Sequence, residues 1–277
     1  MGRAVAVSLL GWFVSACSPA GPGPSPSPLV PDTITLRLDA PVGQVSRFRE
    51  VGNIIPLDPM DMAAPRLYET MYWTRTVTGA AGDTETVAVT LDSSIIAPPP
   101  GDHLNSPRVI RFNQTTRIVG LDSRGQVLWE RPAGIRSFPA GLVDVMVGEP
   151  FAVGRRPQLR LPGRPVRPGD TWTDSIPYGG ERRAGPAARR VAHLTYELKG
   201  VRVRGGARRA SIAISGEVPW LPGDSALVRC GPRRVEETVD FDVDQRRPVR
   251  WSYSWTSRCD VGRILTLGGS LEGYLEH

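Results

Sequence analysis

The sequence is poor in the residues that most often carry out catalysis or bind metals. It has three histidines, three cysteines and a single lysine, Lys199. The histidines, His103, His193 and His277, stand far apart, and no His/Cys spacing suits a zinc site. No glycine-rich phosphate loop precedes a helical pattern. We therefore expect neither a metal nor a cofactor, and we expect that the protein is not an enzyme.

The motif "GDSAL", residues 223–227, is the one trace of enzymatic chemistry. It resembles the nucleophile block of the GDSL hydrolases, but a serine nucleophile needs a base to activate it. The only histidine after Ser225 is His277, and Tyr274 stands where that family has an aspartate. A simple turn is therefore favoured, and a hydrolase is kept as the weaker alternative.

The sequence also lacks an apolar run of the length that spans a membrane, about 20 residues. Residues 4–14 are apolar and uncharged, follow Arg3 and precede two small residues. This arrangement is typical of a signal peptide. We expect residues 1–16 to be a leader that is removed on export.

The leader runs into Val14-Ser15-Ala16-Cys17, which resembles the bacterial lipobox. The resemblance implies that Cys17 carries a diacylglyceryl group and anchors the protein to a membrane of the bacterial cell envelope. Ser18 stands where family members kept in the inner membrane have an aspartate. The outer membrane, facing the periplasm or the cell surface, is therefore favoured. Residues 17–32 are rich in Pro, Gly and Ser, and we expect them to form an extended tether.

Acidic residues are too few to balance the arginines. The formal net charge is +6 and the pI is about 9.7. A basic protein invites a nucleic-acid interpretation, but an exported protein rarely meets nucleic acid. The arginines also form scattered pairs beside turn residues, such as Arg208-Arg209 and Arg246-Arg247, instead of one dense stripe. Solvated loops are favoured, and attraction to anionic lipid or an anionic envelope polymer is the alternative.

Helical periodicity is almost absent, and alternation of apolar and polar residues is common. In "TVAVTL", residues 86–91, the apolar side chains recur at every second position, as in a half-buried strand. Turn signals separate such runs. We predict one β-rich domain over residues 33–277, built as a curved antiparallel sheet or half-barrel. One short helix is predicted in the apolar segment 137–151.

Two parts of the chain are similar in layout. Predicted hairpins at 74–95 and 117–130 are matched by hairpins at 195–218 and 237–251, about 120 residues later. This spacing suggests two similar halves, residues 33–135 and 160–277. The identity between them is slight, so a chain without internal duplication is the open alternative.

A short motif carries a further resemblance. Pro165-Val166, the turn at Gly169-Asp170 and the following Trp172 resemble a PVxxGDxW pattern of uncharacterised exported bacterial β-rich domains. More distantly, the layout looks like the half-barrel of lipoprotein-carrier proteins. These resemblances imply a β-rich envelope protein and no particular activity.

The two remaining cysteines form an even pair once Cys17 is assigned to the lipid. Export places Cys230 and Cys259 in an oxidising compartment, and they flank a predicted hairpin turn near Gln245. Uninterrupted strands would place them on opposite faces, so we expect a break at Gly231-Pro232. With that break, a cross-strand disulfide between Cys230 and Cys259 is predicted.

Aromatic residues are the strongest hint of a binding surface. Trp251, Tyr253 and Trp255 alternate with polar residues, so their rings should face the same way. With Trp172 and Trp129, they are candidates for the lining of a cavity, and core packing is the alternative. Asp240, Asp242 and Asp244 are predicted to form a solvated strand face and not a calcium loop.

Two functions are compatible with these features. The leading one is an envelope lipoprotein whose curved sheet binds a lipid-like or other apolar ligand. The alternative is a structural or assembly lipoprotein that docks on envelope partners through its basic loops. Nothing in the sequence indicates the oligomeric state.

Overall fold

The computed structural model describes residues 33–56, 67–97, 108–110, 115–133, 159–178, 190–219, 229–260 and 264–276. Over these ranges every regular element is a β-strand, which confirms the all-β prediction. No helix in the described part is long and apolar enough to span a membrane. The predicted helix at 137–151, the leader, Cys17 and the serine motif at 223–227 lie outside the described residues.

The strands fall into two groups along the chain. The first group is β1 (Val45–Pro56), β2 (Leu67–Ala81), β3 (Thr84–Ala97), β4 (Arg108–Ile110), β5 (Thr115–Asp122) and β6 (Val127–Ala133). The second group is β7 (Thr171–Tyr178), β8 (Arg190–Arg204), β9 (Ala207–Val218), β10 (Arg229–Cys230), β11 (Arg233–Asp242), β12 (Arg247–Asp260) and β13 (Ile264–Glu276).

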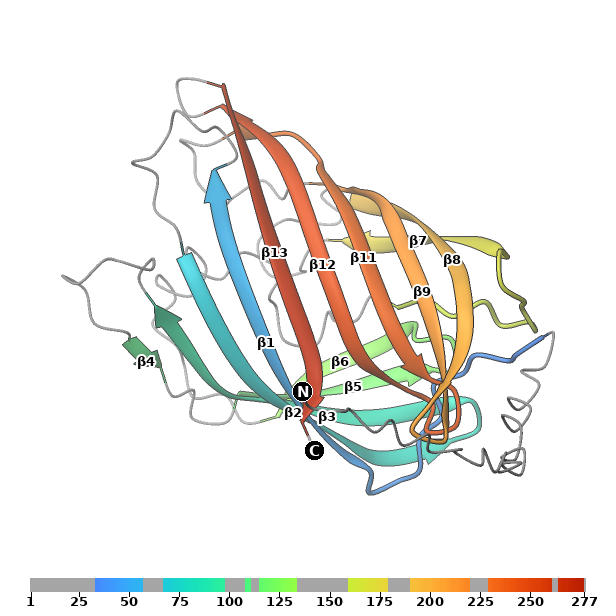
Figure 1. The fold of residues 1–277 in the computed structure, drawn as a ribbon. Coiled ribbons are helices and arrows are strands. Elements are labelled where there is room, and N and C mark those ends of the chain that lie inside the picture. Colours follow the sequence, from blue (N-terminus) through green and yellow to red (C-terminus); the bar gives the residue numbers. More distant parts are fainter. Residues whose placement is uncertain are drawn as a thin grey trace, which may run out of the picture.

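All of these strands belong to one antiparallel sheet. The order is β6-β5-β3-β2-β1-β13-β12-β11-β9-β8-β7, with β4 beside β3 and β10 beside β12. The end strands β6 and β7 do not pair with each other, so the sheet is open. It is strongly curved, as Figure 1 shows, which confirms the prediction of a curved antiparallel sheet. The two groups of strands join where β1 pairs with β13.

The four predicted hairpins are all present, as β2–β3, β5–β6, β8–β9 and β11–β12. Two of their turns are held in the same way. Asp122 Oδ1 accepts the backbone N–H groups of Arg124 and Gln126, and Asp242 Oδ1 accepts those of Asp244 and Gln245. Such aspartate caps satisfy turn donors that have no strand partner.

Asp242 corrects one expectation from the sequence. It was predicted to share a solvated face with its neighbours, but its side chain is fully buried. Burial is tolerated because the carboxylate accepts turn N–H groups and lies 3.4 Å from the Arg209 guanidinium. The alternation of the strand ends where the turn begins, so strand position does not determine whether Asp242 is exposed or buried.

The β2–β3 and β8–β9 hairpins each have a bulge, and the two bulges lie at matching places. The register of β2 with β3 shifts between Val77 and Gly79, and that of β8 with β9 shifts between Leu198 and Gly200. The two sites are 121 residues apart by their glycine numbers (79 and 200). This correspondence agrees with two similar halves, and the duplication itself stays a prediction.

The hydrophobic core lies on one face of the sheet, which we call the inner face. Side chains alternate between this face and the outside, as in β9, where Ala210, Ile212 and Ile214 are buried. Two segments outside the strands, a first one at residues 33–44 and a second one at residues 159–170, add apolar side chains to the same core. They contribute Ile34, Leu36, Leu38, Leu159, Leu161 and Val166.

These two segments tie the ends of the open sheet together. Ile34 and Val166 exchange backbone hydrogen bonds of 2.8 and 2.9 Å. The turn between β5 and β6 then receives both segments, because Leu38 N–H donates to Ser123 and Leu161 N–H donates to Arg124. Gly125 in that turn has a φ of +85°, and a Cβ there would lie 2.4 Å from the Leu159 carbonyl oxygen. Only glycine allows this close approach.

Candidate functional site

The β12 aromatic residues face inward together. Trp251 and Trp255 are buried, and Tyr253 between them is half-buried and packs against the core. Trp251 belongs to an aromatic cluster with Phe48 and Trp73, with ring centroids 4.6 to 5.9 Å apart. Its indole N–H donates to Glu50 Oε1 at 3.0 Å. Trp251 is therefore a packed core residue with a polar partner.

Glycines in β13 make room for these indoles. A Cβ on Gly273 would lie 2.0 Å from Trp251 Cε2, and a Cβ on Gly269 would lie 2.5 Å from Trp255 Nε1. The two tryptophans thus lie flat on the backbone of the neighbouring strand. The glycine-rich stretch "LGGSLEG" in residues 267–273 was the sequence signal for this contact.

Trp172 and Trp129 are placed differently from each other. Trp172 on β7 stacks against Tyr196 at 5.6 Å and donates to the Arg160 carbonyl oxygen at 2.7 Å. Trp129 on β6 is 40% exposed and lies over Gly120. Because Val119 next to Gly120 faces the core, Gly120 and Trp129 lie on the outer face. The structure does not bring Trp129 to the inner face with the others.

A transverse row of paired residues crosses the inner face and mixes polar with apolar side chains. We call it the interior belt, and each of its members is paired with the next one on the adjacent strand. From β7 to β2 its members are Trp172, Tyr196, Ile214, Glu237, Tyr253, Leu271, Gly52 and Glu69. An apolar concave surface with a few polar groups is the usual make-up of a small-molecule site.

Glu69, at one end of the belt, is a buried carboxyl group. It accepts a hydrogen bond from Ser94 Oγ. Burial raises the pKa of Glu69, and the nearby carboxyl group of Glu50 raises it further, while the Ser94 hydrogen bond opposes the shift. The neutral acid is therefore favoured more than in water. This end of the belt can present both a donor and an acceptor to a ligand.

The raised pKa of Glu69 makes a prediction about stability. The folded state holds the Glu69 proton more tightly than the unfolded chain does. The contribution of this group to the stability of the fold is therefore complete below the ordinary carboxyl pKa, and it is lost as the pH rises through the raised pKa of the folded state. Glu69→Gln should unfold at a higher urea concentration than wild type at pH 7, with little difference at pH 4. Glu272→Gln, on an exposed part of β13, is the matched control. Equal pH profiles for wild type and Glu69→Gln would contradict this.

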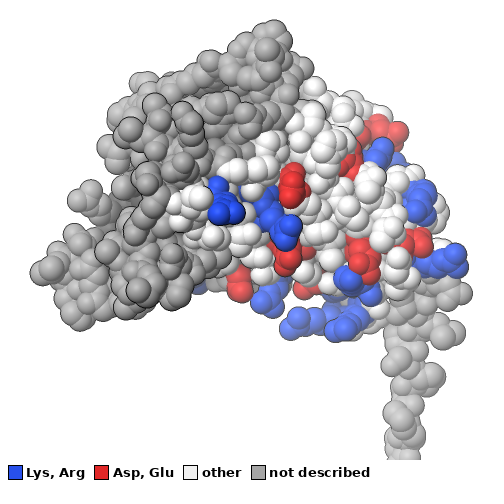
Figure 2. All heavy atoms as spheres, turned by 90° about the horizontal axis from the view of Figure 1, so that it is seen from above, with Lys and Arg blue, Asp and Glu red and all other residues white. Residues whose placement is uncertain are grey.

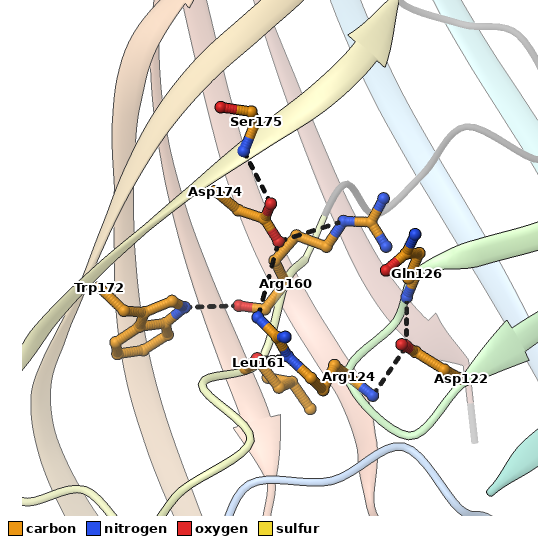
Figure 3. Close-up of polar contacts among 8 residues, drawn as sticks. All are labelled: Asp122, Arg124, Gln126, Arg160, Leu161, Trp172, Asp174 and Ser175. Atoms are coloured by element: carbon orange, nitrogen blue, oxygen red, sulfur yellow. Dashed lines mark hydrogen bonds and ion pairs between the residues drawn. The ribbon is translucent and has the colours of Figure 1, made fainter.

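At the β7 end, the belt meets a cluster of charged residues that sequence reasoning missed. We call it the seam cluster, and it consists of Arg124, Arg160 and Asp174 (Figure 3). Arg124 Nη2 and Arg160 Nε each lie 3.8 Å from Asp174 Oδ2. Arg124 comes from the β5–β6 turn and Asp174 from β7. The cluster therefore links the two ends of the open sheet.

Arg160 is the buried member of the seam cluster. It is only 7% exposed, and burial lowers the pKa of its guanidinium, an effect that Asp174 opposes. Its Nη1 atom has no hydrogen-bond partner. Burial also raises the pKa of the adjacent Tyr196 phenol well above its ordinary value, so Tyr196 is a neutral hydrogen-bonding group.

The sequence signals the segment that carries Arg160, but not the burial of the Arg160 side chain. Leu36-Arg37-Leu38 and Leu159-Arg160-Leu161 are the same tripeptide, and each inserts both leucines into the core. Arg37 projects to the surface and pairs with Asp83, whereas Arg160 is enclosed. The alternation alone predicts an exposed arginine in both cases. The packing of β7 against the second segment makes the difference.

The cysteine positions agree with the predicted register. Cys230 on β10 is directly opposite Cys259 on β12. Beyond Gly231-Pro232 the pairing moves by one residue, to Arg234 opposite Thr256. The expected break is therefore present, held by the hydrogen bond from Gly231 N–H to the Arg258 carbonyl oxygen. The disulfide itself stays a prediction.

Comparison with known proteins adds no relative. No protein-family model matches the chain, and no curated protein matches it.

Proposed function

We propose that the chain is a bacterial envelope lipoprotein that binds an amphipathic, lipid-like molecule on the inner face of its sheet. Cys17 carries the lipid anchor, the outer membrane is the favoured location, and Cys230 and Cys259 form a disulfide. The protein binds and does not catalyse. The observation that supports the ligand most is the interior belt, where half-buried Trp172 and Tyr253 stand beside carboxyl and phenol groups.

The belt suits an amphipathic molecule better than a purely apolar one. Above and below it the paired rows are largely apolar, as in Leu198, Ile212, Val239 and Trp251 on the next row. These rows are packed in the core, so hydrocarbon would lie against the half-buried rings of Trp172 and Tyr253, while the half-buried Glu237 would contact polar atoms. Burying hydrocarbon contributes about 25 cal/mol for each Å² removed from water, and the polar groups fix the orientation.

The alternative, docking on partners through basic loops, has less support. The basic side chains seen in Figure 2 are interspersed with acidic ones. Several turn arginines are also engaged within the chain: Arg208 lies 2.6 Å from Asp244, and Arg246 lies 2.5 Å from Asp39. Arg233 of the 233–234 pair is buried and lies over Trp255. Guanidinium groups already paired with carboxylates offer less to an acidic partner.

Photo-cross-linking in membranes that contain the full-length protein tests the ligand. A long-chain lipid probe with a photoreactive group in its chain should label peptides of β12 and β7, around Tyr253 and Trp172. Tyr253→Ala should lower the labelling several-fold. Trp129→Ala, on the outer face, is the matched control and should leave it unchanged. Labelling that is absent from β12 and β7, or that is confined to β6, would overturn the proposal.

A further inference from the structure

Arg160 has hydrogen-bonding capacity that the protein leaves unused. Its guanidinium is more than nine-tenths buried, its Nη1 has no partner, and its Nε lies 3.8 Å from Asp174 Oδ2. A guanidinium stays charged at any accessible pH and can only donate hydrogen bonds. A buried charged donor without an acceptor is costly, so this group is poised for an incoming acceptor.

A second guanidinium stands at the same place. Arg124 is half-exposed, donates through Nε to the Leu161 carbonyl oxygen at 3.1 Å, and lies 3.8 Å from the same Asp174 oxygen. One carboxylate oxygen is thus shared by two cations, at a distance longer than a charge-assisted hydrogen bond. In Figure 3 the two terminal nitrogens of the Arg160 guanidinium point away from Asp174.

The other carboxylate near Arg160, that of Asp122, already accepts hydrogen bonds from the backbone. Asp122 contributes to the field at Arg160, but its Oδ1 accepts two backbone N–H groups of the β5–β6 turn, at 3.0 and 2.6 Å. Tyr196 is neutral and adds no opposing charge. The negative charges of Asp174 and Asp122 lower the affinity for an anion without supplying Arg160 Nη1 with a partner.

The seam cluster is also contiguous with the interior belt. Trp172, a member of the belt, donates to the Arg160 carbonyl oxygen at 2.7 Å, and Tyr196 stacks on Trp172. Leu159 and Leu161, on either side of Arg160, are fully buried in the core. A ligand that reaches Trp172 along the belt would therefore come close to these guanidinium groups.

We propose that Arg160 and Arg124 bind an oxyanion, a carboxylate or a phosphate, that forms the head group of the amphipathic ligand. This inference rests on the proposed function and names the class of its ligand as an anionic amphiphile. The oxyanion accepts hydrogen bonds from Arg160 Nη1 and from Arg124, whose fork-shaped donors match such groups. Tyr196 and Trp172 then contact the first part of the chain.

Two probes that differ only in the head group test the inference. A photoreactive long-chain fatty acid and the corresponding fatty alcohol are compared in membranes that contain the full-length protein. In wild type, the acid should label the inner strands, here β7 and β12, roughly tenfold more efficiently than the alcohol does, as expected for a hydrogen bond to a charged group. Arg160→Met should reduce this ratio to about one.

Three variants keep the outcome interpretable. Arg164→Met removes an exposed arginine of the same segment, which lies 3.5 Å from Asp170, and should keep the acid preference. Arg160→Lys retains the charge but not the fork, and should give an intermediate ratio. Asp174→Asn removes the competing carboxylate, so the acid preference should rise.

The possible results separate the two proposals. Equal labelling by acid and alcohol, or an acid preference that survives in Arg160→Met, overturns the oxyanion site and leaves the apolar site standing. Absence of inner-strand labelling by either probe overturns the proposed function. If inorganic phosphate removes the acid preference without affecting alcohol labelling, the oxyanion site is supported, and a free anion is sufficient to fill it.

Discussion

Trp251→Ala is expected to lower the free energy of unfolding by about 3–5 kcal/mol. The side chain is 2% exposed and packs against Phe48 and Trp73 over the backbone of Gly273. Alanine would leave a cavity that the glycine below cannot fill. It would also remove the indole N–H that donates to the buried carboxyl group of Glu50. For a domain of ordinary stability, about 5–15 kcal/mol, this is about a fifth of the total or more.

Chemical denaturation of wild type and variant, followed by circular dichroism, measures the effect. Trp129→Ala is the matched control, because it removes the same side chain from the outer face, where Trp129 is 40% exposed. We expect the control to lose about 1 kcal/mol or less, as is usual for surface positions. Similar losses in the two variants would show that the packing around Trp251 does not stabilise the fold as described.

The strands of this fold could be predicted from the sequence because local pattern determines them. Alternation in "TVAVTL" becomes β3, and Gly205-Gly206 becomes the turn between β8 and β9. Hairpins close over a few residues, so their partners are adjacent in the chain. The same local logic predicted the break at Gly231-Pro232 from the parity of Cys230 and Cys259.

The pairing of β1 with β13 could not be predicted in this way. Phe48 is opposite Leu275, although more than 200 residues separate them in the sequence. Such a pairing depends on the curvature of the whole sheet, which no short window encodes. The inner charges were missed for a related reason. Arg75 has the parity of Trp73 and Val77, yet a charged residue is usually assigned to the outside.

Burial of Arg75 is explained by its partner on the next strand. It lies 2.6 Å from Glu85, and both side chains are buried. Burial raises the pKa of Glu85, and Arg75 opposes this shift. Arg160 differs because its carboxylate partner is more distant and is shared with Arg124. Arg75 thus has a carboxylate in close contact, although its Nη1 has no hydrogen-bond partner. Arg160 has no carboxylate in close contact, and we propose that a ligand contributes most there.

Cys17→Ser is expected to abolish lipid attachment completely. The anchor that the lipobox implies is a thioether to the cysteine sulfur, and a serine hydroxyl does not replace that thiol. Several acyl chains at about 0.8 kcal/mol per buried methylene give lasting membrane attachment, so their loss is large in energy terms. Growth with a clickable fatty acid, followed by intact-mass measurement, should show labelled, processed wild type and unlabelled, unprocessed variant.

Ser18→Ala is the matched control, since it changes the adjacent residue and keeps the thiol. It should be labelled and processed like wild type. Acyl label retained in Cys17→Ser would contradict the anchor. The measurement is also independent of the ligand, because it reports a covalent bond to residue 17, whereas probe cross-links report contacts near Tyr253 and Trp172. An unlabelled Cys17→Ser protein that still cross-links the lipid probe on its inner strands would therefore separate the anchor from the binding face.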